Sequence, residues 1–119
     1  MVQQCVLVAE DEMIIGADLC DTVEEAGYEV AGPYDTSSSA LESLQERTPD
    51  LAILDIRLDD GLVFSLAERL MAANVPVIFH SGEVSPNEVS GRYPGSHALA
   101  KPCPPNEIID TVREVLAAA

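Results

Sequence analysis

The chain has 119 residues, the size of one domain, and 47% of them are hydrophobic while 23% are charged, a balance typical of a globular protein. Asp and Glu number 21 against 6 Lys and Arg, and the resulting net charge of −15 disfavours binding to nucleic acid and to anionic lipid. No apolar run approaches the roughly 20 residues that span a bilayer, and the start of the chain lacks the basic segment of a signal peptide. We therefore expect a cytoplasmic domain that covers residues 1–119 and does not contact a membrane.

The first half of the chain alternates apolar runs with segments of helical spacing. Residues 6–9 form an apolar run typical of a buried strand, and the next segment has an apolar residue at every fourth position until Gly27, which predicts a helix. Residues 28–31 predict a weaker strand that the following Gly-Pro pair closes, and the serines at 37–39 can cap a second helix. Residues 51–54 predict a third strand.

The second half continues the alternation. After Gly61, apolar residues recur at i, i+3, i+4 and i+7, which predicts a helix with one buried stripe. That stripe consists of Val63, Leu66, Ala67 and Leu70. Residues 75–79 predict a fourth strand, residues 98–100 a short fifth, and the prolines at 104–105 can begin a last helix. Between them, residues 81–97 contain prolines and glycines with little periodicity, so we expect a loop or at most a short, degraded fourth helix.

This pattern predicts an α/β fold of the type (βα)₅. The strands are continuous apolar runs, so helices should cover both faces of a parallel five-stranded sheet. Right-handed crossovers then favour the doubly wound, flavodoxin-like strand order 2-1-3-4-5. In that order the first and third strands are neighbours, and ligands bind beyond their carboxyl ends.

Polar residues follow the predicted strands at this edge. They are Glu10 and Asp11 after the first strand, Asp55 after the third, Ser81 after the fourth, and Lys101, the single lysine, after the fifth. At an effective dielectric constant of about 20, two carboxylates 4 Å apart repel by on the order of 4 kcal/mol. Either the acids protonate or a cation lies among them, and Mg²⁺ is suited to such oxygen ligands.

In this arrangement Asp11 and Asp55 would be direct Mg²⁺ ligands, and Glu10 would act through water. The backbone carbonyl of Arg57, two residues beyond Asp55, could complete the set. A carboxylate that the metal neutralises and that faces Lys101 is a candidate nucleophile toward a phosphoryl group. The expected site would therefore accept phosphate onto Asp55.

The sequence resembles the receiver domain of two-component response regulators along essentially its whole length. VLVAEDE carries the acidic pair, LAILD the phosphoacceptor, IFHSG the hydroxyl residue and ALAKP the lysine. The resemblance implies that Asp55 takes a phosphoryl group from a phosphohistidine on a sensor histidine kinase or a histidine phosphotransferase, and that Ser81 and Lys101 contact its oxygens. Such a domain is no enzyme beyond losing its own phosphoryl group, and phosphorylation changes which proteins it binds.

Two departures from the family pattern concern switching. Receivers commonly have an aromatic residue three positions before the lysine, where this chain has Ala98. The stretch DIRLDDG after the phosphoacceptor is short and lacks a proline. These features, with Phe79, Ser81 and Gly82, resemble the alphaproteobacterial receivers named for a Phe-Ala-Thr-Gly-x-Tyr motif, the FAT GUY class, although Val84 stands where the tyrosine is expected. His80, in place of alanine, is expected at the rim of the site without a special role.

Three other readings remain open from the sequence. The chain, expected to be a stand-alone receiver, can instead be a fragment of a larger regulator. A Mg²⁺-dependent aspartyl phosphohydrolase would carry a second acid two residues after its nucleophile, where this chain has Arg57. A flavin-binding flavodoxin-like domain would need a hydroxyl- and glycine-rich loop after the first strand, where this chain has AEDEMI.

Overall fold

The computed structural model describes residues 3–82, 93 and 96–118, and within this part the expected alternation of strands and helices is present. The elements are β1 (Cys5–Ala9), α1 (Met13–Glu25), β2 (Glu29–Tyr34), α2 (Ser37–Ser43), β3 (Leu51–Leu54), β4 (Arg57–Leu58), β5 (Gly61–Leu62), α3 (Phe64–Ala72), β6 (Val77–Ser81), β7 (His97–Ala100) and α5 (Pro105–Ala118). The main sheet has five parallel strands in the order β2-β1-β3-β6-β7. Counted along the main sheet alone, this is the order 2-1-3-4-5, and the predicted fold class is confirmed.

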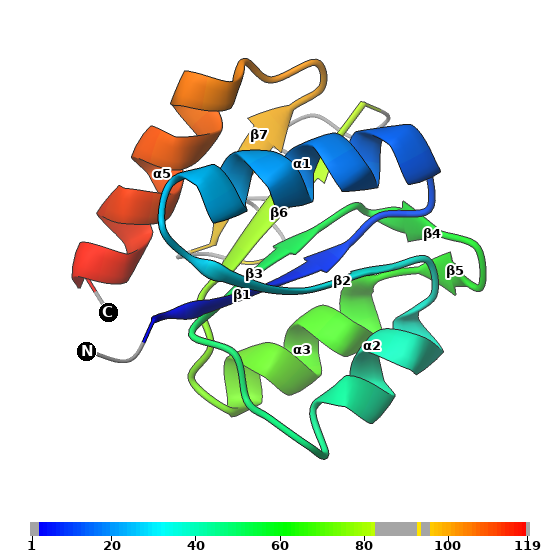
Figure 1. The fold of residues 1–119 in the computed structure, drawn as a ribbon. Coiled ribbons are helices and arrows are strands. Elements are labelled where there is room, and N and C mark those ends of the chain that lie inside the picture. Colours follow the sequence, from blue (N-terminus) through cyan, green and yellow to red (C-terminus); the bar gives the residue numbers. More distant parts are fainter. Residues whose placement is uncertain (1–2, 83–92, 94–95, 119) are drawn as a thin grey trace.

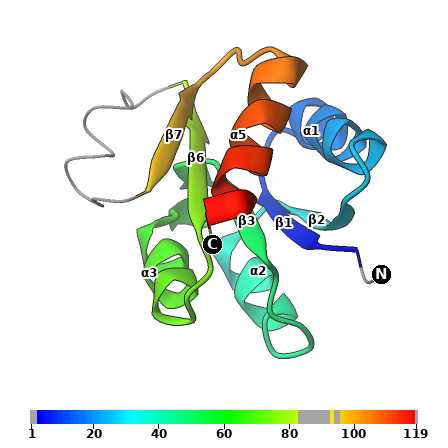
Figure 2. The ribbon, with the colours of Figure 1, turned by 90° about the vertical axis from the view of Figure 1, so that its left-hand side faces the viewer.

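Helices cover both faces of the main sheet, which explains the continuous apolar runs. Helices α1 and α5 lie on one face, and α2 and α3 lie on the other (Figures 1 and 2). Along β1, Val6 and Val8 belong to the core on the α1 and α5 side, while Leu7 and Ala9 belong to the core on the α2 and α3 side. Successive strand residues face opposite sides, so a strand in the middle layer needs apolar side chains at every position.

The predicted apolar stripe of the third helix is also confirmed. Its four members are fully buried, and together with Phe79 they belong to the core between α2, α3 and the sheet. None of the helices in the described part of the chain has the length and hydrophobicity needed to cross a membrane.

The second strand differs from the prediction, because it does not end at Gly32 and Pro33. It continues to Tyr34 through a bulge, in which Leu7 pairs with Ala31 but Ala9 pairs with Tyr34. A bulge inserts residues into one strand without ending the pairing, so a Gly-Pro pair inside a strand is compatible with it. Tyr34 thereby reaches the carboxyl end of β1.

The stretch after Asp55 forms regular secondary structure. Arg57–Leu58 and Gly61–Leu62 pair as an antiparallel hairpin, β4 and β5. At its tip, the carboxylate of Asp60 accepts hydrogen bonds from the backbone N–H groups of Ser37 and Ser38, at 2.8 and 3.1 Å, in the first turn of α2. The side-chain cap of α2 is Thr36, whose hydroxyl accepts a bond from the N–H of Ser39, rather than the serine cluster itself.

Two smaller predictions have different outcomes. The fourth strand of the main sheet, β6, runs over Val77–Ser81 instead of residues 75–79, because the backbone of Ala52 pairs with Val77 as its first partner. The prediction of a degraded fourth helix concerns residues that lie almost entirely outside the described part of the chain.

The bulge at Gly32 generates a stability prediction with a matched control. Gly32 and Gly61 both have φ of +118°, but a Cβ would overlap the carbonyl oxygen of Val8 at Gly32 and would meet nothing within 4 Å at Gly61. We expect Gly61→Ala to lower the free energy of unfolding by roughly 1–2 kcal/mol through the positive φ alone. Gly32→Ala should lower it by roughly 1–3 kcal/mol more through steric overlap. Urea denaturation measures both, and equal losses would contradict this account of the bulge.

Candidate functional site

Backbone hydrogen bonds between neighbouring strands fix the positions of the polar residues of the site. The N–H of Glu10 donates to the carbonyl of Tyr34 at 2.8 Å, and the N–H of Asp55 donates to the carbonyl of Ala9 at 2.9 Å. On the other side of β3, the N–H of Lys101 donates to the carbonyl of Ser81 at 3.1 Å. The pairing of the sheet therefore continues into Glu10, Asp55 and Lys101, and the carboxyl ends of the strands hold these residues in register.

The three acids form a tight cluster at this edge. One oxygen of each of Glu10, Asp11 and Asp55 lies within 4.8 Å of the others. Glu10 is 3% exposed and Asp55 is 8% exposed, so water screens their charges poorly. The structure confirms the prediction that these three carboxylates lie together at one edge of the sheet.

Lys101 supplies the positive charge inside the cluster. Its Nζ lies 2.8 Å from Oε2 of Glu10 and 3.1 Å from Oδ2 of Asp55. A buried carboxylate without a counter-charge is strongly unfavourable, and one ammonium group here contacts two of them. One cation still leaves the cluster with an excess of carboxyl groups.

The pKa values of these groups follow from burial and from their neighbours. Burial raises the pKa of Glu10 to about 7, with a further increase from the negative charge of Asp55 that the contact with Lys101 only partly offsets. Burial and Asp55 also raise the pKa of Asp11. Burial alone would lower the pKa of Lys101, but its contacts with Glu10 and Asp55 outweigh burial and raise it. Lys101 is thus charged, while Glu10 and Asp11 hold protons more readily than ordinary carboxyl groups.

A small cavity opens beside the cluster. Its volume is about 110 Å³, and it is lined by Asp11, Glu12, Asp55, Arg57, Gly82 and Lys101. The carboxylate oxygens of Asp11 and Asp55 are hard ligands of the kind that Mg²⁺ prefers, and the hairpin places Arg57 at the same cavity. The donor set and the repulsion among the acids fit a small divalent cation bound at this position.

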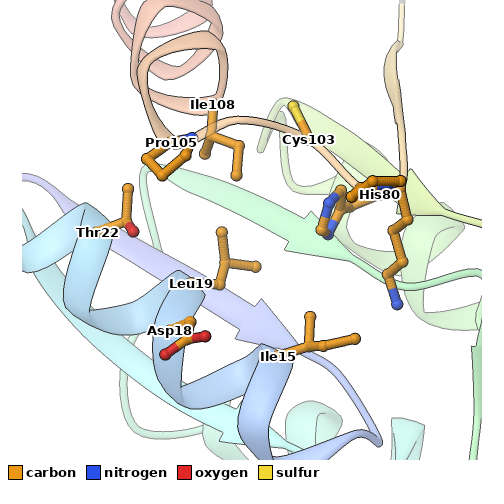
Figure 3. A pocket seen from close by; sticks show the side chains of 10 residues that line it. Ile15, Asp18, Leu19, Thr22, His80, Cys103, Pro105 and Ile108 are labelled. Atoms are coloured by element: carbon orange, nitrogen blue, oxygen red, sulfur yellow. The ribbon is translucent and has the colours of Figure 1, made fainter.

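Ser81 and His80 occupy neighbouring positions of β6 but face different surroundings. Ser81 is the last residue of the strand and is 5% exposed. His80, which we expected at the rim of the site, is instead buried, at 5% exposed, and lines a different cavity between α1 and α5 (Figure 3). Because alternate residues of a strand share a face, His80 follows Ile78 into the core on the α1 and α5 side. This alternation is the sequence signal that could have placed it there.

Comparison with known proteins identifies the family. Residues 6–113 match the model of the response regulator receiver domain. The chain belongs to this family. The resemblance drawn from the sequence motifs is thereby confirmed for the receiver domain as a whole.

Individual relatives agree with this assignment. The chain is similar to the transcriptional regulatory protein PdtaR of Mycobacterium tuberculosis, with 28% identity over 107 residues that cover 90% of this chain and 52% of the relative. Among solved structures, it is similar to the receiver domain of the PhyR response regulator from Erythrobacter litoralis, with 29% identity, a TM-score of 0.86, and coverage of 97% of this chain and 91% of that one. A response regulator receiver protein from Sinorhizobium medicae has 27% identity, a TM-score of 0.87, and coverage of 98% and 96%.

This receiver domain spans about half the length of the curated relatives it matches, with 52% of PdtaR and 50% of YbdJ from Bacillus subtilis covered. The similarity therefore concerns the receiver part of those proteins. Membership of the FAT GUY subgroup stays a prediction.

The raised pKa of Glu10 generates a prediction for cation binding. Protons compete with a divalent cation for the cluster below the pKa of about 7, so we expect the apparent affinity for Mg²⁺ to be about tenfold weaker at pH 6 than at pH 8. Isothermal titration calorimetry at the two pH values measures the difference. Glu10→Gln should weaken this dependence, whereas Glu68→Gln, at an exposed position of α3, should preserve it. Equal affinities at both pH values in the unmodified protein would contradict the prediction.

Proposed function

We propose that this receiver domain accepts a phosphoryl group on Asp55 from a phosphohistidine of a sensor histidine kinase or a histidine phosphotransferase. The observation that carries the proposal is the position of Asp55. Its carboxylate lines a cavity of about 110 Å³ together with Asp11, and its Oδ2 lies 3.1 Å from the ammonium group of Lys101. A buried carboxylate held beside a fixed cation is arranged to attack a group whose charge that cation can stabilise.

In the proposed transfer, a carboxylate oxygen of Asp55 forms a bond to phosphorus while the bond from phosphorus to the donor's histidine nitrogen breaks. The electron pair of that bond returns to the imidazole of the donor. Lys101 already lies between Glu10 and Asp55, so its ammonium group can exchange these contacts for the oxygens of the arriving group. Ser81, at the end of β6, supplies a hydroxyl for another of those oxygens.

In this proposal the acidic cluster also binds a metal ion. Asp11, Asp55 and the backbone carbonyl of Arg57 would hold Mg²⁺, and Glu10 would act through water. The bound ion would neutralise charge on the phosphoryl oxygens. Because its pKa is raised to about 7, Glu10 would release its proton as the cation binds.

The output of the domain is proposed to be a change in protein–protein binding. Phosphorylation shifts the population of conformations that a downstream partner recognises, and the domain itself carries out no further chemistry beyond loss of its own phosphoryl group. We propose that residues 1–119 form this one domain, that it acts in the cytoplasm, and that it either stands alone or belongs to a longer regulator.

The two rival readings receive less support from the geometry. The cavity at the end of β1, where a flavin-binding domain of this fold would hold phosphate, measures only about 110 Å³ and is lined by the acids Asp11 and Glu12, which would repel phosphate. In the aspartyl phosphohydrolase reading, the position two residues after the nucleophile should be an acid, but Arg57 is exposed and basic. The receiver function accounts for Lys101 and for the acids together.

The proposal is tested by phosphorylation of the purified protein. Incubation with Mg²⁺ and either acetyl phosphate or a phosphorylated histidine kinase should add one phosphoryl group, seen by intact-mass spectrometry. Asp55→Asn should abolish the gain because it removes the nucleophile, and Asp59→Asn, an exposed acid in the adjacent hairpin, should keep it. Absence of a gain with both donors, or an unchanged gain in Asp55→Asn, would refute the proposal.

Lys101 is expected to couple phosphorylation to the rest of the domain. In Lys101→Ala, phosphoryl transfer to Asp55 should still occur and Mg²⁺ binding should be largely intact. In the unmodified protein, phosphorylation should shift the amide resonances of β7 and of the start of α5, because Lys101 lies between these two segments and contacts the phosphoryl group. In Lys101→Ala the same resonances should shift much less on phosphorylation. Two-dimensional NMR before and after phosphorylation measures this response.

Arg113→Ala is the control, because this exposed residue of α5 lies away from the acidic cluster. It should show the full response of the unmodified protein. A full response in Lys101→Ala as well would contradict the proposed role of Lys101.

A further inference from the structure

The hairpin that follows Asp55 meets a segment from a distant part of the sequence. Within the hairpin, Arg57 pairs with Leu62 and Leu58 pairs with Gly61. Figure 1 shows β4 and β5 next to the start of α2, at the carboxyl end of the main sheet. The chain that leaves Asp55 and the chain that begins α2 are therefore in contact.

Three hydrogen bonds make this contact. The carboxylate of Asp60 accepts bonds from the backbone N–H groups of Ser37 at 2.8 Å and of Ser38 at 3.1 Å. Beside it, the backbone N–H of Asp59 donates to the carbonyl of Asp35 at 3.0 Å. The bond from Ser37, with a smaller contribution from Ser38, lowers the pKa of Asp60, so its carboxylate is charged at neutral pH. Hydrogen bonds to a charged acceptor are stronger than those between neutral groups, so the two bonds to Asp60 are the stronger part of this contact.

The tip of the hairpin has little else to hold it. Each strand of the hairpin has two residues, and an isolated pair of strands is at best marginally stable in water. Leu58 is buried in the core on the α2 and α3 side, which holds one strand of the hairpin. Asp59, Asp60 and Gly61 at the tip are exposed. The hydrogen bonds to the start of α2 therefore fix the position of the tip.

Arg57 connects the hairpin to the acidic site. It lines the cavity of about 110 Å³ together with Asp11 and Asp55. Its backbone N–H lies 3.5 Å from Oδ1 of Asp55, at the long end of the hydrogen-bond range. Asp60 follows Arg57 closely in the same hairpin, so a change in the tilt of the hairpin moves the backbone of Arg57 relative to the cavity.

We propose that Asp60 is a positioning residue for the cation site: its bonds to the first turn of α2 hold the hairpin so that the backbone of Arg57 stays aligned at the cavity. Asp60 does not line that cavity, so it acts only through the hairpin. Mg²⁺ tolerates little deviation from octahedral geometry, and a small displacement of one ligand therefore weakens its binding. The inference rests on the cation site of the proposed function, and it gives α2 a part in holding that site.

Magnesium binding to variants of the full chain tests the inference without phosphorylation. NMR titration with Mg²⁺, followed at the amide resonances of Asp11 and Asp55, measures the affinity at the site. Asp60→Ala removes both bonds, and we expect it to weaken Mg²⁺ binding by on the order of tenfold, the lower end of the effect of groups that orient metal ligands. Asp60→Asn keeps one oxygen for the bond from Ser37, so it should weaken the binding less than Asp60→Ala.

Two controls separate positioning from other effects of the change. Asp59→Ala removes the same charge at the neighbouring position, where the side chain makes no hydrogen bond with the described residues, and it should leave the Mg²⁺ affinity unchanged. Thr36→Ala removes the side-chain cap of α2, whose hydroxyl accepts a bond from the N–H of Ser39 at 3.0 Å. It should lower the free energy of unfolding in urea, as the loss of a cap does, without weakening Mg²⁺ binding.

Equal Mg²⁺ affinities of Asp60→Ala and the unmodified protein would overturn the inference and leave the proposed function standing. A loss in Thr36→Ala or Asp59→Ala as large as that in Asp60→Ala would also overturn it, because stability or charge would then explain the loss. If Asp60→Ala does not fold, the comparison of Asp60→Asn with the two controls decides in its place. A lack of Mg²⁺ binding to the unmodified protein would contradict the cation site itself, and the inference with it.

Discussion

The contact of one lysine with two buried carboxylates organises this receiver domain. Lys101 lies within 3.1 Å of Asp55 and 2.8 Å of Glu10, and it provides the only lysine charge in a chain of net charge −15. The contact links β1, β3 and β7, three strands that are far apart in sequence. A buried charge that loses its partner is strongly unfavourable. A second cation or an arriving anion therefore changes which groups Lys101 pairs with. Such a change of ion pairs is what links the arrival of a phosphoryl group to the strands that hold the site.

The structure also shows how the surroundings of the site differ from the expected pattern of the family. Ala98 leaves no aromatic side chain three positions before Lys101, and it packs against the same core as Tyr93. The Tyr93 ring stacks on Phe79 with centroids 5.8 Å apart, and it lies 5.4 Å from the ring of Phe64. Phe79 is two residues before Ser81 on the same strand, so its contact with Tyr93 places aromatic rings next to the site.

The sequence allowed the prediction of elements that depend on local pattern. The strand Leu51–Leu54 and the apolar stripe of α3 match the prediction, because burial on one or both faces dictates the spacing of apolar residues. The grouping of Glu10, Asp55 and Lys101 could also be predicted, since parallel strands end at the same edge. The bulge at Gly32 and the bonds from Asp60 to α2 could not, because they depend on partners distant in sequence. His80 was misplaced for a different reason, since its polarity was weighed more heavily than its position in the alternation of β6.

The central claim is that Asp55 and its acidic neighbours form a site for a phosphoryl group and a divalent cation. The most direct test is a crystal structure of the full chain grown with Mg²⁺ and beryllofluoride, a stable analogue of the phosphoryl group. The account predicts beryllofluoride on a carboxylate oxygen of Asp55, Mg²⁺ on Asp11, Asp55 and the carbonyl of Arg57, and Lys101 in contact with a fluorine atom. Beryllofluoride bound elsewhere, or a metal held without Asp55, would contradict it.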